Sequence, residues 1–414
     1  MKSIPKDVVI IGGGPAGLAA AAELRRQGIQ DILVLEREKT SGGILRQCIH
    51  DGFGLTRFGE SLSGPEYAAR FQEEAGRLGI DCRTDTMVIS VSPQREVTAV
   101  SRGGLVRYRA RAVILAMGCR ERTRGALAIP GERPAGVFTA GVAQAYLNLY
   151  NTMVGKDVVI LGSGDIGMIM ARRMTLEGAN VKAVFEIQPY PSGLPRNIQQ
   201  CLIDYNIPLY LSHTVTGIHG RERLTGVTVS RVDERRRPIP GTEREYPCDT
   251  LILSVGLIPE NELSRGAGVT LDGHTQGAVV DEYFRTGAEG IFSAGNVLHV
   301  HDLVDFVSLE AERTAGAVAE YIKSGSLPPC RLNISCGDGV GNTVPQKISG
   351  KKDVRISLRV SRPFRDCAIQ VIQNGKVIVS SPRKGNVNPA EMVQVSVPQS
   401  VLAPDGNLEV KVKC

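Results

Sequence analysis

The sequence predicts an α/β protein with two parallel-sheet domains and a small all-β domain at its C-terminal end. Two observations predict the parallel sheets: a repeated strand, glycine turn and helix, and further short apolar strands that end in Gly. A third observation, alternating apolar and polar positions after residue 330, predicts the β domain. The 414 residues, 42% hydrophobic and 22% charged, suffice for two or three domains.

The internal repeat is the strongest feature. Residues 7–17 read DVVIIGGGPAG, and residues 157–167 read DVVILGSGDIG. Each copy joins a β-branched run, typical of a buried strand, to a helix-forming run through a Gly-x-Gly-x-x-Gly turn. A second strand follows and ends in an acid, Glu36 or Glu186, 19 residues after the last Gly in both copies. The expected helices are 18–27 and 168–177, and the expected second strands are 32–35 and 181–185.

Two such units predict two Rossmann-like dinucleotide-binding domains. The first Gly permits the tight turn, the second lets the backbone approach a pyrophosphate, and the third lets helix and strand pack closely. The helix N-terminus attracts the phosphates, and the acid accepts hydrogen bonds from ribose hydroxyls. The carboxylate of Glu186 repels a 2′-phosphate and favours NAD over NADP, unless a nearby Arg compensates. The expected binding residues are Gly12, Gly14, Pro15, Ala16, Gly17, Glu36 and Arg37 in the first copy, and Gly162, Gly164, Asp165, Ile166, Gly167 and Glu186 in the second.

Three further segments look like short buried strands that end in a glycine turn: residues 112–118, 250–256 and 290–296. Residues 303–323 follow the last of them with apolar residues at helical spacing. Together with the repeat, these segments resemble the pyridine nucleotide–disulfide oxidoreductase superfamily of flavoproteins, over residues 5 to about 325.

This resemblance implies that the first copy binds FAD and the second binds NAD. Residues 290–296 resemble the second FAD motif, which usually ends in Gly-Asp; here Asn296 replaces the acid and is expected to hydrogen-bond the ribityl chain. The next helix is expected to aim its N-terminus at the flavin and stabilise the negative charge of the reduced ring. Further cofactor contacts are expected from Gly43, Gly118, Gly256 and Gly295.

In this superfamily the NAD domain is inserted into the FAD domain. The expected domains are 1–119 with 286–328 for FAD, 120–285 for NAD, and 331–414 for the β domain. Strands are expected at 354–361, 368–372, 376–380, 393–397 and 408–413 of an antiparallel sandwich, with a hairpin turn at residues 374 and 375.

A narrower resemblance concerns residues 42–54 and 118–125. They resemble bacterial NAD-linked flavoprotein subunits that act beside a second flavoprotein, of the glycerol-3-phosphate dehydrogenase or amino-acid oxidase type. Opine dehydrogenase and hydrogen cyanide synthase subunits belong to the same group. The resemblance implies an electron-transfer subunit, with a second flavoprotein dehydrogenase subunit and a separate small iron–sulfur protein as partners. The alternatives are a self-contained NADH-dependent reductase of a disulfide, peroxide or oxygen, and a non-catalytic redox sensor or scaffold.

Cys48 is the candidate redox group of that self-contained reductase. It lies where disulfide reductases place a redox Cys, and Arg46 and His50 are expected to lower its pKa. No second Cys follows within five residues, so the other interpretation is a buried thiol. His299 and His301 are candidate catalytic residues in a proton relay, or else capping and packing residues.

Composition limits the kinds of metal site, cellular location and binding partner that can be expected. The nine Cys include no Cys-x-x-Cys, so no metal site is expected, and their odd number in a cytoplasmic chain suggests mostly buried thiols. No signal peptide or membrane-spanning run is expected. Residues 331–414 hold 13 Lys and Arg against 6 Asp and Glu, which accounts for the whole net charge of +6. Nucleic acid is not an expected ligand, since aromatic residues do not interleave with the charges. This basic segment is either a solubilising surface or a docking face for an acidic partner subunit.

Overall fold

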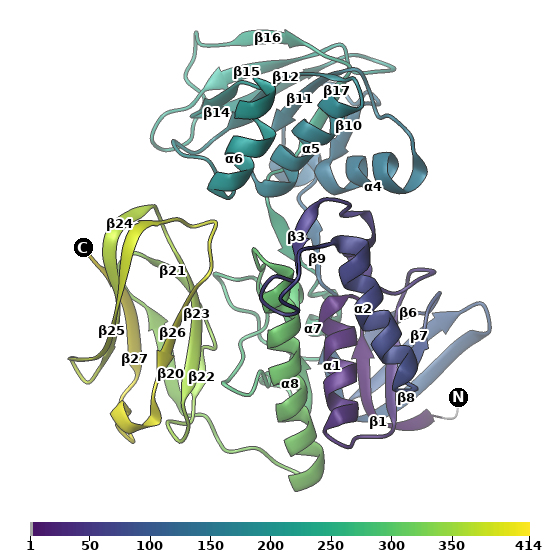
Figure 1. Ribbon diagram of the computed structural model, residues 1–414, viewed down its shortest axis with the longest axis vertical. Helices are drawn as coiled ribbons and strands as arrows, with labels where there is room; N and C mark the ends of the chain where they lie inside the picture. Colours follow the sequence, from purple (N-terminus) through teal and green to yellow (C-terminus); the bar gives the residue numbers. More distant parts are fainter. Residues whose placement is uncertain (1–2) are drawn as a thin grey trace. The chain divides into compact units, whose positions relative to one another are not determined.

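The computed structural model describes residues 3–414 (Figure 1). The chain divides into two compact units. The first unit comprises Met1–Cys119 and Pro259–Cys414, and the second comprises Arg120–Ile258. The chain leaves the first unit at β9 (Cys119–Glu121) and returns at β18 (Leu257–Pro259).

The first unit is built on a seven-stranded sheet. In order across the sheet, its strands are β5 (Asp81–Arg83), β2 (Ile32–Leu35), β1 (Ser3–Ile11), β8 (Gly104–Leu115), β7 (Glu96–Ser101) and β6 (Met87–Val91), with β19 (Ile291–Ser293) also paired to β8. β1 runs parallel to β2 and to β8, with Val9 opposite both Leu33 and Val113. All four residues of β2 are buried, which explains its uninterrupted run of apolar residues.

Three helices lie side by side against this sheet (Figure 1): α1 (Pro15–Arg26), α2 (Gly64–Arg77) and α8 (Val304–Ser324). The alanines of α1 leave room for α8, whose Ala311 and Ala315 share the same buried core. The Ser63 hydroxyl and the Glu66 carboxylate form a capping box that starts α2. The expected helices 18–27 and 303–323 are therefore present, within a few residues of their expected ends. Shorter elements are η1 (Gly43–Gln47), β3 (Asp51–Phe53), β4 (Leu62–Ser63), α7 (Glu262–Gly266) and η3 (Gly295–Val297).

Residues 259–285 belong to the first unit, although the sequence assigned them to the inserted domain. Ala267, Val269 and Val280 are buried in one core with Val91 and Val97 of the large sheet. Burial of these side chains against β6 and β7 moves the boundary from residue 285 to residue 258. The boundary at residue 119 agrees with the expected one.

The second unit contains a five-stranded parallel sheet and a three-stranded antiparallel sheet. The parallel sheet has the order β10 (Val137–Thr139), β17 (Thr250–Leu253), β11 (Asp157–Leu161), β12 (Asn180–Glu186) and β13 (Leu209–Leu211). The antiparallel sheet has the order β14 (His213–His219), β15 (Gly226–Arg231) and β16 (Arg244–Pro247). The helices are α3 (Arg124–Leu127), α4 (Ala140–Tyr150), α5 (Asp165–Leu176), α6 (Pro195–Cys201) and η2 (Ile203–Tyr205). The repeat thus forms β11, α5 and β12 here and β1, α1 and β2 in the first unit.

The C-terminal residues of the first unit form two sheets around a core of their own. One sheet has the order β22 (Lys347–Ile348), β20 (Leu332–Cys336), β27 (Leu408–Lys413), β24 (Phe364–Gln373) and β25 (Lys376–Val387), and the other has the order β21 (Val340–Val344), β23 (Val354–Val360) and β26 (Val393–Val397). A short η4 (Gln399–Val401) precedes β27. The hairpin turn is present, with Asn374 and Gly375 both at positive φ.

The β domain differs from its expectation in two respects. β20 and β27 pair in parallel, so the domain is not wholly antiparallel. β21 and β22 were missed because the first is interrupted by Gly and Asn and the second has only two residues. β20 was missed although its residues LNISC alternate between apolar and polar as a strand should. Among residues 3–414, no helix is long and apolar enough to cross a membrane.

Candidate dinucleotide sites

The first glycine loop joins β1 to α1. Gly12 has φ +108°, and a Cβ there would lie 2.3 Å from the carbonyl oxygen of Ala116, so only Gly fits. A Cβ at Gly17 would lie 1.9 Å from the carbonyl oxygen of Gly12. Glu36 is buried, and its Oε2 accepts a hydrogen bond of 2.7 Å from Gly13 N–H. The loop, the start of α1 and the acid therefore face one another, as the spacing predicts.

Three other segments converge on this first loop. A Cβ at Gly43 would lie 3.1 Å from Gly14 Cα, and a Cβ at Gly295 would lie 2.9 Å from Ala16 Cβ. The side-chain nitrogen of Asn296 lies 3.7 Å from the Sγ of Cys119, the residue after Gly118. The structure thus brings these expected FAD residues together. Arg37 instead points to solvent beside Glu38, with 60% of its side chain exposed.

The second glycine loop repeats this arrangement in the second unit. Gly162 has φ +98°, and a Cβ there would lie 2.0 Å from the carbonyl oxygen of Ser254. A Cβ at Gly167 would lie 2.6 Å from Ser254 Cβ. Glu186 accepts a hydrogen bond of 3.0 Å from Ser163 N–H, as Glu36 does from the corresponding N–H. Gly256 is at positive φ, with the side chain of Arg122 nearby.

The polar side chains of the second loop bind one another. The hydroxyls of Ser163 and Ser192 each lie 2.6 Å from Glu186 Oε2. Asp165 Oδ1 accepts hydrogen bonds from Leu194 N–H and from the amide of Asn197. Ser192 and Asn197 lie outside the repeated motif, so the sequence comparison gave no reason to select them.

Cys48 lies at the end of η1 and is buried. Burial raises the pKa of its thiol to about 12. Arg46 donates to Gly43 O and to Thr40, and the ring of His50 lies 5.0 Å from that of Phe53. The expected lowering of the Cys48 pKa is therefore contradicted: in this structure the group is a neutral thiol.

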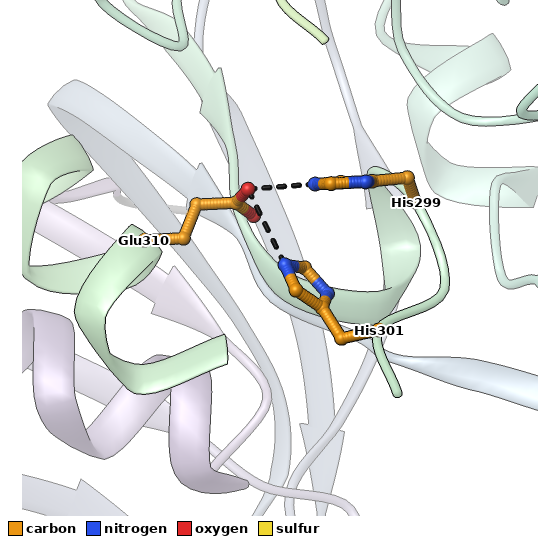
Figure 2. A group of neighbouring side chains, drawn as sticks. All are labelled: His299, His301 and Glu310. Atoms are coloured by element: carbon orange, nitrogen blue, oxygen red, sulfur yellow. Dashed lines mark hydrogen bonds and ion pairs between the residues drawn. The ribbon is translucent and has the colours of Figure 1, made fainter. Parts of the chain in front are cut away.

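His299 and His301 converge on Glu310, which projects from α8 (Figure 2). Glu310 Oε2 lies 2.7 Å from His299 Nε2 and 3.4 Å from His301 Nε2, and all three side chains are at most 5% exposed. Burial lowers the pKa of His299, against the attraction of Glu310. Burial would raise the pKa of Glu310, but the two imidazoles hold it well below its ordinary value. Glu310 was missed by the sequence analysis, although it lies three residues after Val307 on the buried face of α8.

Taken together, two glycine loops, each with a facing acid and each following a strand with parallel neighbours, define a dinucleotide-binding protein of the α/β class. The chain belongs to the pyridine nucleotide-disulphide oxidoreductase family, whose model matches residues 6–319. It is an FAD-dependent NAD(P)H oxidoreductase. Each glycine loop leaves space that a side chain would otherwise fill, and each has a carboxylate beside it, Glu36 or Glu186. These two sites fit two dinucleotides.

Relatives of two kinds are similar to this chain. A thioredoxin reductase of Streptomyces clavuligerus is 28% identical over 75% of this chain and 90% of its own length. The hydrogen cyanide synthase subunit HcnB of Pseudomonas aeruginosa is 27% identical over 75% of this chain and 69% of its own length. The crystal structure of T. acidophilum thioredoxin reductase matches 78% of this chain and 99% of its own, with TM-score 0.64 and 26% identity. The likeness to HcnB agrees with the narrower resemblance seen in the sequence.

Proposed function

We propose that the chain is the electron-transfer subunit of a multi-subunit cytoplasmic dehydrogenase. Its partners in this proposal are a second flavoprotein, of the glycerol-3-phosphate or amino-acid and opine dehydrogenase type, and a small iron–sulfur protein. One observation carries the proposal: Cys48 is buried with its Sγ 3.4 Å from Ile44 O, and no second Cys follows within five residues. A self-contained disulfide relay would lack its redox pair. The likeness to the subunit HcnB supports the same reading.

Bound FAD supplies the hydride chemistry, and the chain positions the two dinucleotides. The first loop would hold the FAD pyrophosphate on the N-terminus of α1, with Glu36 on the ribose. Asn296 would contact the ribityl chain. Asp305, in the first turn of α8, accepts hydrogen bonds from Gly54 N–H and Thr56 N–H. These bonds tie the start of α8 to residues 51–56. In the second unit, Glu186 would receive the NAD ribose.

The test is an anaerobic titration of the FAD-loaded protein with NADH, beside Cys48→Ser, followed through the visible spectrum. We expect one equivalent of NADH to bleach the flavin in both proteins, because FAD is the only redox centre in this proposal. A second equivalent with a long-wavelength thiolate–flavin band, both lost in Cys48→Ser, would establish Cys48 as a redox group and overturn the proposal.

The likeness to thioredoxin reductase favours one alternative, a self-contained NADH-dependent reductase. Steady-state assays of the isolated chain separate the two functions. Turnover with artificial dyes alone is expected of an electron-transfer subunit. Rapid turnover with a disulfide, peroxide or oxygen would support the alternative instead.

The basic β domain is the proposed docking face for the partner subunit. Deletion of residues 331–414 would test it poorly, because Gln346 exchanges two hydrogen bonds with Val280 elsewhere in the first unit. Charge reversal at the exposed Arg365, Lys376 and Lys384 leaves that contact intact. We expect the reversed protein to keep FAD but no longer to co-purify with a second flavoprotein. Arg77→Glu, at an exposed site on α2, is the control.

A further inference from the structure

The orientation of the Asn296 amide is fixed by its neighbours. Asn296 Oδ1 accepts a hydrogen bond of 3.0 Å from the backbone N–H of His301. The Asn296 amide nitrogen faces Cys119 Sγ on the other side. Since Oδ1 is an acceptor, His301 Nδ1, which lies 3.2 Å from it, must carry a hydrogen atom. The backbone N–H of His301 thus fixes the Asn296 amide, and the amide in turn requires a hydrogen atom on His301 Nδ1.

The other ring nitrogen of His301 faces Glu310. The Oε2 of Glu310 already accepts from His299 Nε2–H, and its Oε1 accepts from Gly295 N–H at 2.9 Å. A bare lone pair on His301 Nε2 would therefore oppose a carboxylate oxygen at 3.4 Å, between two side chains that are each only 2% exposed. One proton between His301 Nε2 and Glu310 Oε2 converts this repulsion into attraction. Such a proton belongs to the pair rather than to either residue.

Charged groups on several elements surround this pair. Arg313, one turn beyond Glu310 on α8, is exposed at its surface, and its positive charge attracts the Glu310 carboxylate. From β23, Arg359 donates to Val300 O at 3.0 Å and lies 3.5 Å from Asp302. Arg355, also on β23, repels the positive charge of Arg313. The β domain thus holds the peptide between the two histidines.

The cluster of His299, His301 and Glu310 is hydrogen-bonded to both residues of the second FAD motif. Glu310 accepts from Gly295 N–H, and His301 N–H donates to Asn296. This also explains the replacement of Asp by Asn at position 296. A second carboxylate 3.2 Å from His301 could not donate toward Cys119, and it would leave the buried cluster with a net negative charge.

We propose that His301 and Glu310 hold one buried proton between them, so that the pair adds no net negative charge beside the second FAD motif, and that they orient Asn296 of this motif. They are positioning residues, and the ligand they serve is the ring of the flavin in its reduced, negatively charged form. This second step rests on the proposed function, since it requires FAD at this motif. The first step concerns the protein alone.

The first step is tested by NMR of FAD-loaded, oxidised protein labelled with [15N]histidine. We expect His301, assigned by the loss of its signals in His301→Gln, to show two N–H groups, one on Nδ1 and one on Nε2. Glu310→Gln should remove the Nε2 proton and retain the Nδ1 proton. A single N–H for His301 in the unaltered protein, or Nε2 signals of a stoichiometrically bound zinc ion, would overturn the proposal.

A matched control lies in the second unit. His219 Nε2 and Glu245 Oε2 are also 3.4 Å apart, but these side chains are 47% and 65% exposed. Water screens that pair, so Glu245→Gln should leave the His219 signals at pH 8 unchanged. A proton on His219 as persistent as that on His301 would show that burial is not the cause.

The second step is tested by the midpoint potential of the bound flavin. His301→Gln leaves the Glu310 charge uncompensated, so the ratio of reduced to oxidised flavin at a fixed potential should fall about tenfold, or ~30 mV for a two-electron couple. His219→Gln should not move it. An unchanged potential together with two N–H groups on His301 would overturn the coupling to flavin alone. If the chain instead turned over a disulfide rapidly, the proposed electron-transfer role would fail. The expected His301 N–H signals and the expected shift of the flavin potential would stay the same.

Discussion

The two glycine loops share a backbone but differ in how their acids are bonded. Glu36 accepts hydrogen bonds from two backbone N–H groups, those of Gly13 and Glu38. Glu186 accepts from the corresponding two N–H groups and also from the hydroxyls of Ser163 and Ser192. A carboxylate offers about four acceptor positions. Glu36 therefore keeps an acceptor position open on each oxygen, whereas Glu186 keeps one on Oε1 alone, because three donors already crowd its Oε2.

The start of each helix differs in the same sense. α1 begins with Pro15, which carries no charge, whereas α5 begins with Asp165. A carboxylate at a helix N-terminus neutralises part of the positive potential that attracts phosphate. The comparison indicates a first loop built for a tightly held cofactor and a second loop built for a nucleotide that exchanges.

The largest loss of nucleotide binding is expected when the first Gly of either loop is replaced by Ala. Gly12→Ala and Gly162→Ala place a Cβ 2.3 Å and 2.0 Å from a carbonyl oxygen at positive φ, which should cost roughly 3 kcal/mol or more. Gly12→Ala should purify with less than about a tenth of its flavin, because the tight first site loses its cradle. Gly162→Ala should keep its flavin but no longer reduce it with NADH. Absorbance per protein and anaerobic NADH titration measure the two losses.

Gly28 and Gly178 provide matched controls for these two variants. Each follows the helix of its repeat at positive φ, yet a Cβ there would meet nothing within 4 Å. Gly28→Ala and Gly178→Ala should cost only about 1 kcal/mol of backbone strain and retain both activities. Loss of flavin in Gly28→Ala would mean that strain, not the close approach, dominates.

An intermediate effect is expected from neutralising the acids. Glu36→Gln should weaken FAD binding roughly 10- to 100-fold, the loss of one charge-assisted hydrogen bond, as measured by flavin release in dilution. Glu186→Gln should weaken NADH binding less, by about threefold, since its oxygens already serve the protein. Equal losses of affinity for FAD and for NADH would contradict the conclusion that Glu36 is more available to its ligand than Glu186.

The sequence predicted the parts of the molecule that follow from local pattern. The repeat, its strands and helices and the two acids depend on glycine turns and apolar runs, and all are present. The boundary at residue 258 was missed because it depends on long-range burial of Ala267 and Val280. Glu310 was missed for the same reason: its partners meet it only once α8 has packed.

The smallest effect would sharpen the comparison most. Ser192→Ala removes one hydroxyl from Glu186 Oε2 and leaves an acceptor position for ribose. Because a ribose hydroxyl that takes the place of the serine hydroxyl should bring a net gain of only about 0.5–1 kcal/mol, NADH should bind roughly two- to fivefold more tightly, as measured by stopped-flow reduction at varied NADH. Ser41→Ala, beside the first loop but bonded to Gln72, should leave FAD binding unchanged. Weaker NADH binding in Ser192→Ala would mean that this hydroxyl contacts the nucleotide itself, and the second loop would then be as ready for its ligand as the first.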